Sequence, residues 1–166
     1  MSRFRKLSSF GTTLLVLITI VVVQGILAYR FRVFESFDLP LIYCVFYGFT
    51  RSKPVASVFL GGALGLLQDS LSGVAMGTNG FSKALLCFAA ASTSLKFNVD
   101  QAITRVFALF LFTLANGLLV TILELAMGTG DAVLRGGLMD LMLSGVFNTL
   151  LGLIMFGFRD RKKHAT

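Results

Sequence analysis

Six apolar stretches account for most of this chain, and basic residues gather in alternate connections between them. The stretches cover residues 10–29, 39–50, 54–68, 80–95, 102–127 and 138–158. A helix needs about 20 apolar residues to cross a bilayer, so the first, fifth and sixth stretches are long enough by themselves. The other three need help from flanking residues, a thinned bilayer or burial among their neighbours. The pattern predicts an all-α, polytopic six-helix transmembrane bundle that forms a single domain over residues 1–166.

The composition agrees with a membrane protein. Hydrophobic residues make up 55% of the chain and charged residues 14%, with a mean hydropathy of +0.83. Soluble domains carry about 25% charged residues. The net charge of +7 is read as a sorting signal and as attraction to anionic lipid. No soluble domain carries the basic residues, so no nucleic-acid partner is expected.

The basic residues predict the orientation, because loops rich in lysine and arginine remain in the cytoplasm. One side would receive only Arg30, Arg32 and Arg135. The other side would receive Arg3, Arg5, Lys6, Arg51, Lys53, Lys96, Arg105, Arg159, Arg161, Lys162 and Lys163. This sorting predicts an inner-membrane protein with both termini in the cytoplasm and a basic tail over residues 159–166.

A four-span alternative would turn residues 39–68 into a re-entrant hairpin. It would place Arg51 and Lys53 at mid-membrane, where each charge costs about 2.5–3.5 kcal/mol on insertion scales. Six spans are therefore favoured. The first stretch ends without a small-x-small cleavage pattern, so it is predicted to be an uncleaved anchor.

Side chains for catalysis or metal binding are scarce in this sequence. His164 is the only histidine and lies in the basic tail, which leaves almost no material for a histidine triad or a zinc site. Cys44 and Cys87 fall inside predicted helices, where they are expected to pack as small apolar residues without a disulfide. No enzyme activity and no cofactor are predicted.

Polar residues and glycines inside the apolar stretches are the better candidates for function, because an unpaired polar group in the membrane is costly. Asn116 and Asn148 lie near the middle of the last two stretches, at similar predicted depths. They are expected to form an interhelical hydrogen bond, or else to contact a ligand or partner. Gly61 and Gly65 allow close approach of a helix, either from within the bundle or from a partner.

The connection between the third and fourth stretches is the densest candidate region. The third helix ends at Asp69, and Gly73 and Gly77 permit positive φ angles in the turn that follows. Asn79 is a fair N-cap for the next helix, whose first turn carries Lys83. Asp69 is expected to pair with Lys83 across this turn, or to satisfy capping groups there.

Residues 37–83 resemble the bacterial rod shape-determining MreD family. The resemblance rests on Pro40 at the entry to the second helix, on the aromatic segment 43–48 before a basic loop, and on a G-L-x-x-D…G…G-x-N-(G/A) pattern. That pattern reads Gly65, Leu66, Leu67, Gln68 and Asp69, then Gly73, then Gly77, Thr78, Asn79 and Gly80. Tyr47 stands where many relatives have tryptophan. The family in turn is similar to the six-helix S-components of energy-coupling-factor vitamin transporters.

The resemblance implies a non-enzymatic scaffold in the cell-elongation complex that builds lateral peptidoglycan. The implied partners are MreC, the cytoskeletal protein MreB, the polymerase RodA and its penicillin-binding transpeptidase, within the lipid bilayer. A homo-oligomer is possible on this interpretation. The alternative function is that of a vitamin-binding S-component of a transporter, which would need convergent polar and aromatic groups in one cavity.

Overall fold

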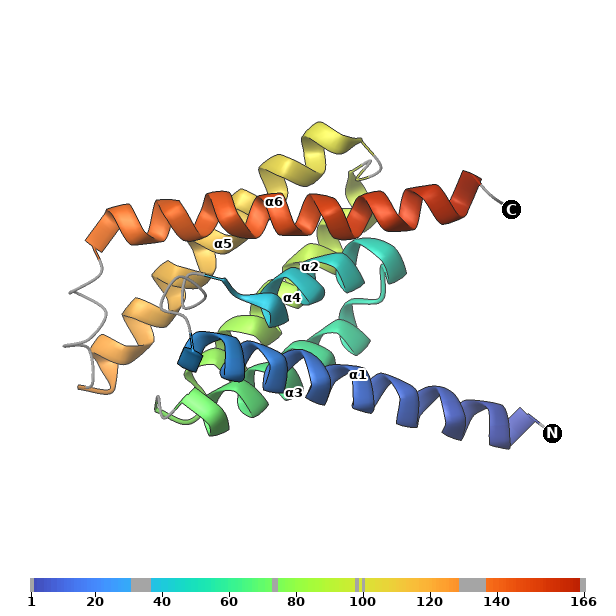
Figure 1. Ribbon diagram of the computed structural model, residues 1–166, viewed down its shortest axis with the longest axis horizontal. Helices are drawn as coiled ribbons and strands as arrows, with labels where there is room; N and C mark the ends of the chain where they lie inside the picture. The colour runs from blue at the N-terminus through green and yellow to red at the C-terminus, as the bar shows by residue number, and fades with distance from the viewer. Residues whose placement is uncertain are drawn as a thin grey trace.

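The computed structural model describes residues 2–30, 37–72, 75–97, 99, 101–128 and 137–164. These residues form six helices and no strand, so the predicted all-α fold is confirmed (Figure 1). The helices are α1 (Ser2–Arg30), α2 (Leu39–Arg51), α3 (Pro54–Ser72), α4 (Thr78–Lys96), α5 (Ala102–Ala126) and α6 (Gly137–His164).

Helix lengths differ from the predicted stretches mainly at the polar ends. Helix α3 continues beyond residue 68 to Ser72, because its last turn includes polar residues that a hydropathy pattern omits. The longer α3 becomes one of three helical segments long and apolar enough to cross a membrane, with Ile103–Ala126 and Leu141–Phe158. Helix α6 continues to His164, so most of the predicted tail is helical.

Helix α2 lies at the centre of the bundle and packs against each of the other five helices. It has only 13 residues, and its buried side includes Leu41, Val45 and Phe49. Burial explains how so short an apolar stretch is accommodated, since its surface meets protein rather than lipid. The most extensive packing in the bundle is between α3 and α4. In Figure 1, α1 and α6 lie on opposite sides of α2.

Two apolar clusters fill the interior around α2. One joins α1, α2, α3 and α4 and contains Leu17, Val21, Cys44, Leu60, Leu64 and Cys87. The other joins α2, α4, α5 and α6 and contains Val45, Phe49, Ala90, Leu109 and Phe156. Cys44 and Cys87 are buried and free, as predicted. The Cys87 thiol donates a hydrogen bond to the Cys44 carbonyl oxygen over 3.4 Å.

The outer surface is apolar and much of the interior is polar. Large hydrophobic side chains are exposed along several helices, including Leu15, Ile26, Phe59, Ile103, Phe107 and Ile154. Buried polar side chains include Asp69, Asn79, Ser82, Lys83, Asn116 and Asn148. Monomeric soluble proteins rarely expose so much contiguous apolar surface, whereas a lipid-facing surface is expected to be apolar. The chain is therefore a membrane protein. Its two ends lie toward the same side of the molecule in Figure 1.

Candidate functional site

Asp38 forms the N-cap of the central helix α2. Its Oδ1 accepts a hydrogen bond from the backbone N–H of Leu41 over 3.0 Å. The next residues, Leu39 and Pro40, begin the helix. Pro40 lacks an N–H, and one is not needed there, because the first N–H groups of a helix have no partner within it. The Asp-Leu-Pro order therefore starts α2 at this point and turns the carboxylate toward the bundle.

The second carboxylate oxygen of Asp38 holds the ammonium of Lys83. The Asp38 Oδ2 to Lys83 Nζ distance is 2.9 Å, and the lysine side chain is completely buried. Removing an ammonium from water costs several kcal/mol unless a counter-charge and further hydrogen bonds compensate it. Asn79, one helical turn earlier on α4, supplies such a bond, because its Oδ1 accepts from Lys83 Nζ over 2.8 Å.

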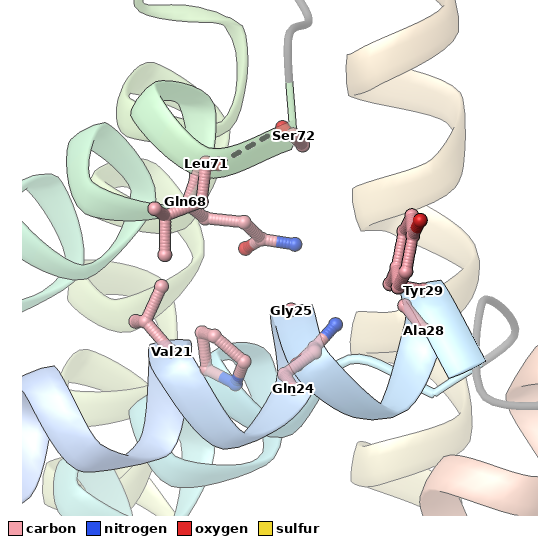
Figure 2. Close-up of a pocket in the computed structure, with 9 residues that line it drawn as sticks. Val21, Gln24, Gly25, Ala28, Tyr29, Gln68, Leu71 and Ser72 are labelled. Atoms are coloured by element: carbon pink, nitrogen blue, oxygen red, sulfur yellow. Dashed lines mark hydrogen bonds between the residues drawn. The ribbon is translucent and has the colours of Figure 1, made fainter. Parts of the chain in front are cut away.

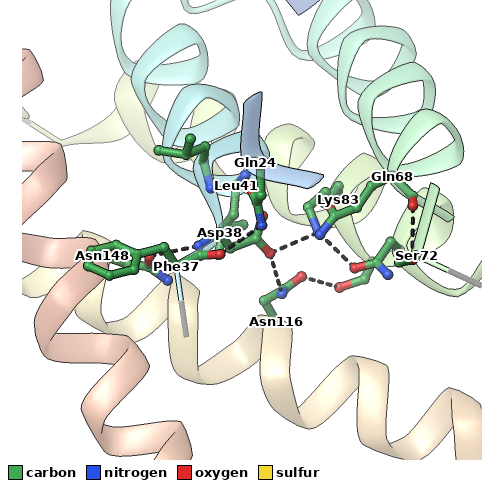
Figure 3. A network of polar contacts seen from close by, with 12 residues as sticks. Gln24, Phe37, Asp38, Leu41, Gln68, Ser72, Lys83, Asn116 and Asn148 are labelled. Atoms are coloured by element: carbon green, nitrogen blue, oxygen red, sulfur yellow. Dashed lines mark hydrogen bonds and ion pairs between the residues drawn. The ribbon is translucent and has the colours of Figure 1, made fainter. Parts of the chain in front are cut away.

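Asn116 of α5 completes the surroundings of the ion pair. Its amide Nδ2 donates to Asp38 Oδ2 over 3.1 Å, and its Oδ1 accepts from the Ser82 hydroxyl over 2.7 Å. Figure 3 shows Lys83 and Asn116 converging on Asp38 from two different helices. Both ends of the Asn116 amide are thus satisfied, as a buried amide requires.

Two further side chains fix the backbone on either side of the Asp38 carboxylate. Gln24 of α1 donates to the Phe37 carbonyl oxygen and accepts from the Leu39 N–H, each over 2.7 Å. Asn148 of α6 accepts from the Asp38 N–H over 2.9 Å. We call the whole set the Asp38 network. It links α1, α2, α4, α5 and α6 through Gln24, Asp38, Asn79, Ser82, Lys83, Asn116 and Asn148.

Asp69 performs a different task from the one predicted. It does not pair with Lys83, whose ammonium bonds to Asp38 and Asn79. Instead its carboxylate accepts from the backbone N–H groups of Gly77, Asn79 and Gly80 over 2.9, 3.1 and 3.1 Å. A carboxylate at the N-terminus of α4 satisfies unpaired donors and complements the helix dipole. The capping alternative is confirmed and the ion pair with Lys83 is wrong.

The N-cap of α4 is Gly77, with a φ of +102°, and not Asn79 as expected. A left-handed backbone favours glycine at that position. Asn79 lies one turn inside, so its side chain reaches Lys83 rather than the helix terminus. Gly73 lies outside the described residues.

The glycines of α3 pack against α4 within the same chain. An added Cβ at Gly61 would clash with the Lys83 carbonyl oxygen, and one at Gly65 with the Asn79 carbonyl oxygen. The absence of a side chain at these two positions therefore allows α3 to contact the α4 backbone directly. That backbone belongs to Lys83 and to Asn79, which bonds to it. This contact leaves no room for a partner helix at the same place.

The predicted hydrogen bond between Asn116 and Asn148 is wrong. Each residue bonds to Asp38 instead, Asn116 through the carboxylate and Asn148 through the backbone N–H. Similar depth along antiparallel helices did not decide the partner, because Asp38 offers a charged acceptor to the Asn116 amide and a backbone N–H donor to Asn148.

Sequence reasoning missed Asp38, Gln24 and Ser82 as members of the site. Asp38 carried a usable signal, since an aspartate directly before Leu-Pro at the start of an apolar stretch is a typical N-cap. The contact between Asp38 and the buried Lys83 depends on the tertiary structure. No comparable local sequence pattern marks Gln24 or Ser82 as members of the site.

The chemistry available in this site is that of paired charges. Asp38 and Lys83 neutralise each other inside the bundle. Within the part of the chain that the structure describes, no three His, Cys, Asp or Glu side chains gather in a way that could hold a metal ion. The Asp38 network is therefore suited to holding helices in fixed positions relative to one another.

The comparison with protein families decides the assignment. The family described as rod shape-determining protein MreD matches residues 4–162, nearly the whole chain. The chain belongs to the MreD family. Membership in the MreD family implies a role in rod shape determination. Neither the curated proteins nor the solved structures contain a match to this chain. The expected likeness to S-components of vitamin transporters therefore stays a prediction.

Proposed function

We propose that this MreD-family protein is a non-enzymatic membrane scaffold of the cell-elongation complex. In this proposal it binds MreC through membrane helices and supports the RodA–transpeptidase synthase, in association with MreB. The observation that carries the proposal is the Asp38 network, in which the carboxylate and the adjoining backbone bond to groups from five helices. A scaffold needs a rigid bundle whose polar groups are paired internally and whose outer surface is free for helix contacts.

The outer surface supports the same proposal. Exposed apolar side chains run along α3, α5 and α6, for example at Phe59, Phe107 and Ile154. Association between membrane helices depends on close packing of such surfaces. The charges of Asp38 and Lys83 are not available to a polar ligand, because they bond to each other.

The deciding experiment is a depletion strain combined with affinity purification. Depletion should turn rod-shaped cells round and wide in any growth medium, and the tagged chain should retain MreC after mild solubilisation. An unrelated six-helix protein with the same tag serves as the control. The scaffold proposal is wrong if a vitamin supplement restores growth of cells that never lost their shape, or if a transporter ATPase module is recovered in place of MreC.

We further propose that the protein crosses the inner membrane six times, with both termini in the cytoplasm. Single cysteines at Met76 and Phe97 test this orientation, because both side chains are exposed and lie in connections at opposite ends of α4. Cys44 and Cys87 are first replaced by alanine. An impermeant thiol reagent should label position 76 in intact cells and both positions after permeabilisation. Labelling of position 97 in intact cells would refute the orientation.

A further inference from the structure

A cavity of about 310 Å³ lies between α1 and α3, beside the start of α2. Pockets that hold small molecules begin at about this size. In Figure 2, residues of α1 form one wall and residues of α3 the opposite wall. The cavity is lined by Val21, Gln24, Gly25, Ala28, Tyr29, Pro40, Gln68, Leu71 and Ser72.

The space exists because α1 presents small residues to α3 at this level. Gly25 and Ala28 lie one turn apart on the α1 wall. A Cβ added at Gly25 would come no closer than 4.0 Å to any neighbouring side chain, the nearest atom being Leu71 Cδ1. Gly61 and Gly65 are different, because there the α4 backbone fills the place of the missing side chain. The glycine at position 25 thus leaves a space that the protein itself does not fill.

One wall of this cavity carries a buried acceptor without a partner. The Oε1 atom of Gln68 is buried and receives no hydrogen bond from the described residues. Gln24, on the opposite wall, uses both ends of its amide to hold Phe37 and Leu39. Buried polar atoms in native proteins nearly always have a partner, so the Gln68 oxygen indicates an occupant that donates a hydrogen bond.

The cavity is amphipathic and lies where helices end. Val21, Pro40 and Leu71 provide an apolar part, while Gln68 and Ser72 provide a polar part. Helix α1 ends at Arg30 and α3 ends at Ser72, so this level corresponds to the membrane–water boundary of a spanning bundle. Tyr29, with an exposed ring at the edge of the cavity, is typical of that boundary.

We propose that this cavity binds a membrane phospholipid whose head group carries hydrogen-bond donors. The head group donates to Gln68 Oε1, and part of an acyl chain lies against the apolar residues near Val21. The cavity has room for groups the size of a side chain. It therefore fits part of a lipid better than a helix, because a helix is about 10 Å wide. The proposal does not depend on MreC binding, so failure of lipid binding would leave the scaffold proposal standing.

A lipid bound in the cavity would affect the Asp38 network through Gln24. This residue lines the cavity and also holds the backbone on both sides of Asp38. A lipid packed against Gln24 restricts its side chain in the conformation that makes those two bonds. A ligand that binds only the folded state raises the thermal midpoint. The bound lipid therefore stabilises this end of the bundle.

The test uses the delipidated full-length protein in detergent, to which phosphatidylglycerol, phosphatidylethanolamine or phosphatidylcholine is added. Retained lipid is counted by native mass spectrometry, and the thermal midpoint is followed in parallel. Phosphatidylglycerol offers hydroxyl donors and phosphatidylethanolamine an ammonium, whereas the choline head group has no donor. We expect the first two lipids to be retained and to raise the midpoint, and phosphatidylcholine to bind about tenfold more weakly, a difference of about 1.4 kcal/mol. The relative strength of the first two identifies which head group the site prefers.

Two variants locate the binding in the cavity. Gly25→Leu fills the space and should abolish lipid retention, while Gly157→Leu is the matched control, because an added Cβ there meets nothing within 4 Å. Gln68→Met keeps the volume but removes the acceptor, so the preference over phosphatidylcholine should disappear. It also serves as the test if Gly25→Leu does not fold.

Several outcomes would overturn the proposal. Equal binding of all three lipids to the wild type would mean that a water molecule, or nothing, satisfies Gln68. Unchanged lipid retention in Gly25→Leu would place the binding elsewhere on the surface. If that variant kept its lipid but lost MreC, the cavity would be a contact for a protein helix instead.

Discussion

The two ends of the central helix α2 are held by opposite kinds of interaction. Around Asp38 and Lys83, a buried ion pair and directed hydrogen bonds join five helices. Toward the other end of α2, aromatic rings hold the helices together. This region begins at Phe46, about 12 Å from Asp38 along the helix axis at a rise of 1.5 Å per residue. There Phe156 of α6 lies 5.1 Å from Phe46 and 6.2 Å from Phe49, measured between ring centroids.

The buried Arg105 at the aromatic end makes different contacts from those of Lys83. The Arg105 guanidinium lies 4.8 Å above the centre of the Phe156 ring, and its Nε donates to the Val99 carbonyl oxygen over 2.9 Å. Sequence reasoning had assigned Arg105 to a basic loop, but it lies buried in the first turns of α5. A ring face and a carbonyl oxygen are among the groups that hold this cation. We expect the aromatic end to tolerate small shifts better than the Asp38 network does.

This contrast shows which contacts of the fold require exact geometry. Dispersion and ring packing have broad optima, so an aromatic cluster accepts changes of similar volume. A buried carboxylate and ammonium must meet at hydrogen-bonding distance, or both remain uncompensated. We therefore expect substitutions at the Asp38 end to be costly and those at the aromatic end to be mild.

The largest effect is expected for Lys83→Met, which leaves the Asp38 carboxylate, only 15% exposed, without its counter-charge. Breaking one partner of such a pair costs about 3–5 kcal/mol. Thermal unfolding in detergent should show a large fall in midpoint, together with little folded protein in the membrane. The double variant Asp38→Asn with Lys83→Met should recover much of the loss, because no charge remains unpaired. Equal loss in the single and double variants would mean that the pair does not couple.

Gly65→Ala should be next, because its methyl group would collide with the Asn79 carbonyl oxygen and push α3 from α4. Overpacking against backbone costs up to about 3 kcal/mol. Gly62→Ala is the matched control, since its methyl group would lie an ordinary 3.8 Å from Ala84 Cβ. Thermal midpoints of the two variants should differ clearly, with the control equal to or above the wild type. A stable Gly65→Ala protein would contradict the close helix contact described here.

Asp69→Ala removes the acceptor of three backbone N–H groups at the start of α4. The loss of a helix cap costs up to about 2 kcal/mol, so the amount of folded protein in the membrane should fall. Asp69→Asn keeps a capping oxygen and should fall less. Quantitative immunoblotting and cell-shape measurements separate structure from function. Normal protein levels with loss of rod shape would indicate a partner contact instead of a cap.

The smallest effect is expected for Phe156→Leu at the aromatic end. The substitution nearly conserves apolar volume and should cost about 1 kcal/mol, through lost ring contacts and the lost Arg105 interaction. Phe158→Leu, on an exposed side chain of the same helix, is the control and should change the midpoint very little. If Phe156→Leu destabilised the protein as much as Lys83→Met, the contrast between the two ends would be wrong.

Much of the fold was predictable because helix positions depend on local pattern. Apolar length and the residues at helix ends placed all six helices within a few residues over their apolar parts. Asp69 was correctly predicted near the end of the third helix and Gly77 in the connection that follows, since the bonds between them are local in sequence. The partners of Lys83, Asn116 and Asn148 were not predictable in this way, because each bond crosses between helices distant in sequence.

The membrane bundle of six helices and the membership in the MreD family can be recognised from the sequence, because apolar length, glycine placement and motif spacing are properties of consecutive residues. The central position of the short α2, and the pairing of the buried lysine with Asp38 and not Asp69, are visible only in the folded chain. The cause is distance, since an ion pair forms where two side chains meet within about 4 Å. Which chain segments meet is set by the packing of α2 against its five neighbours.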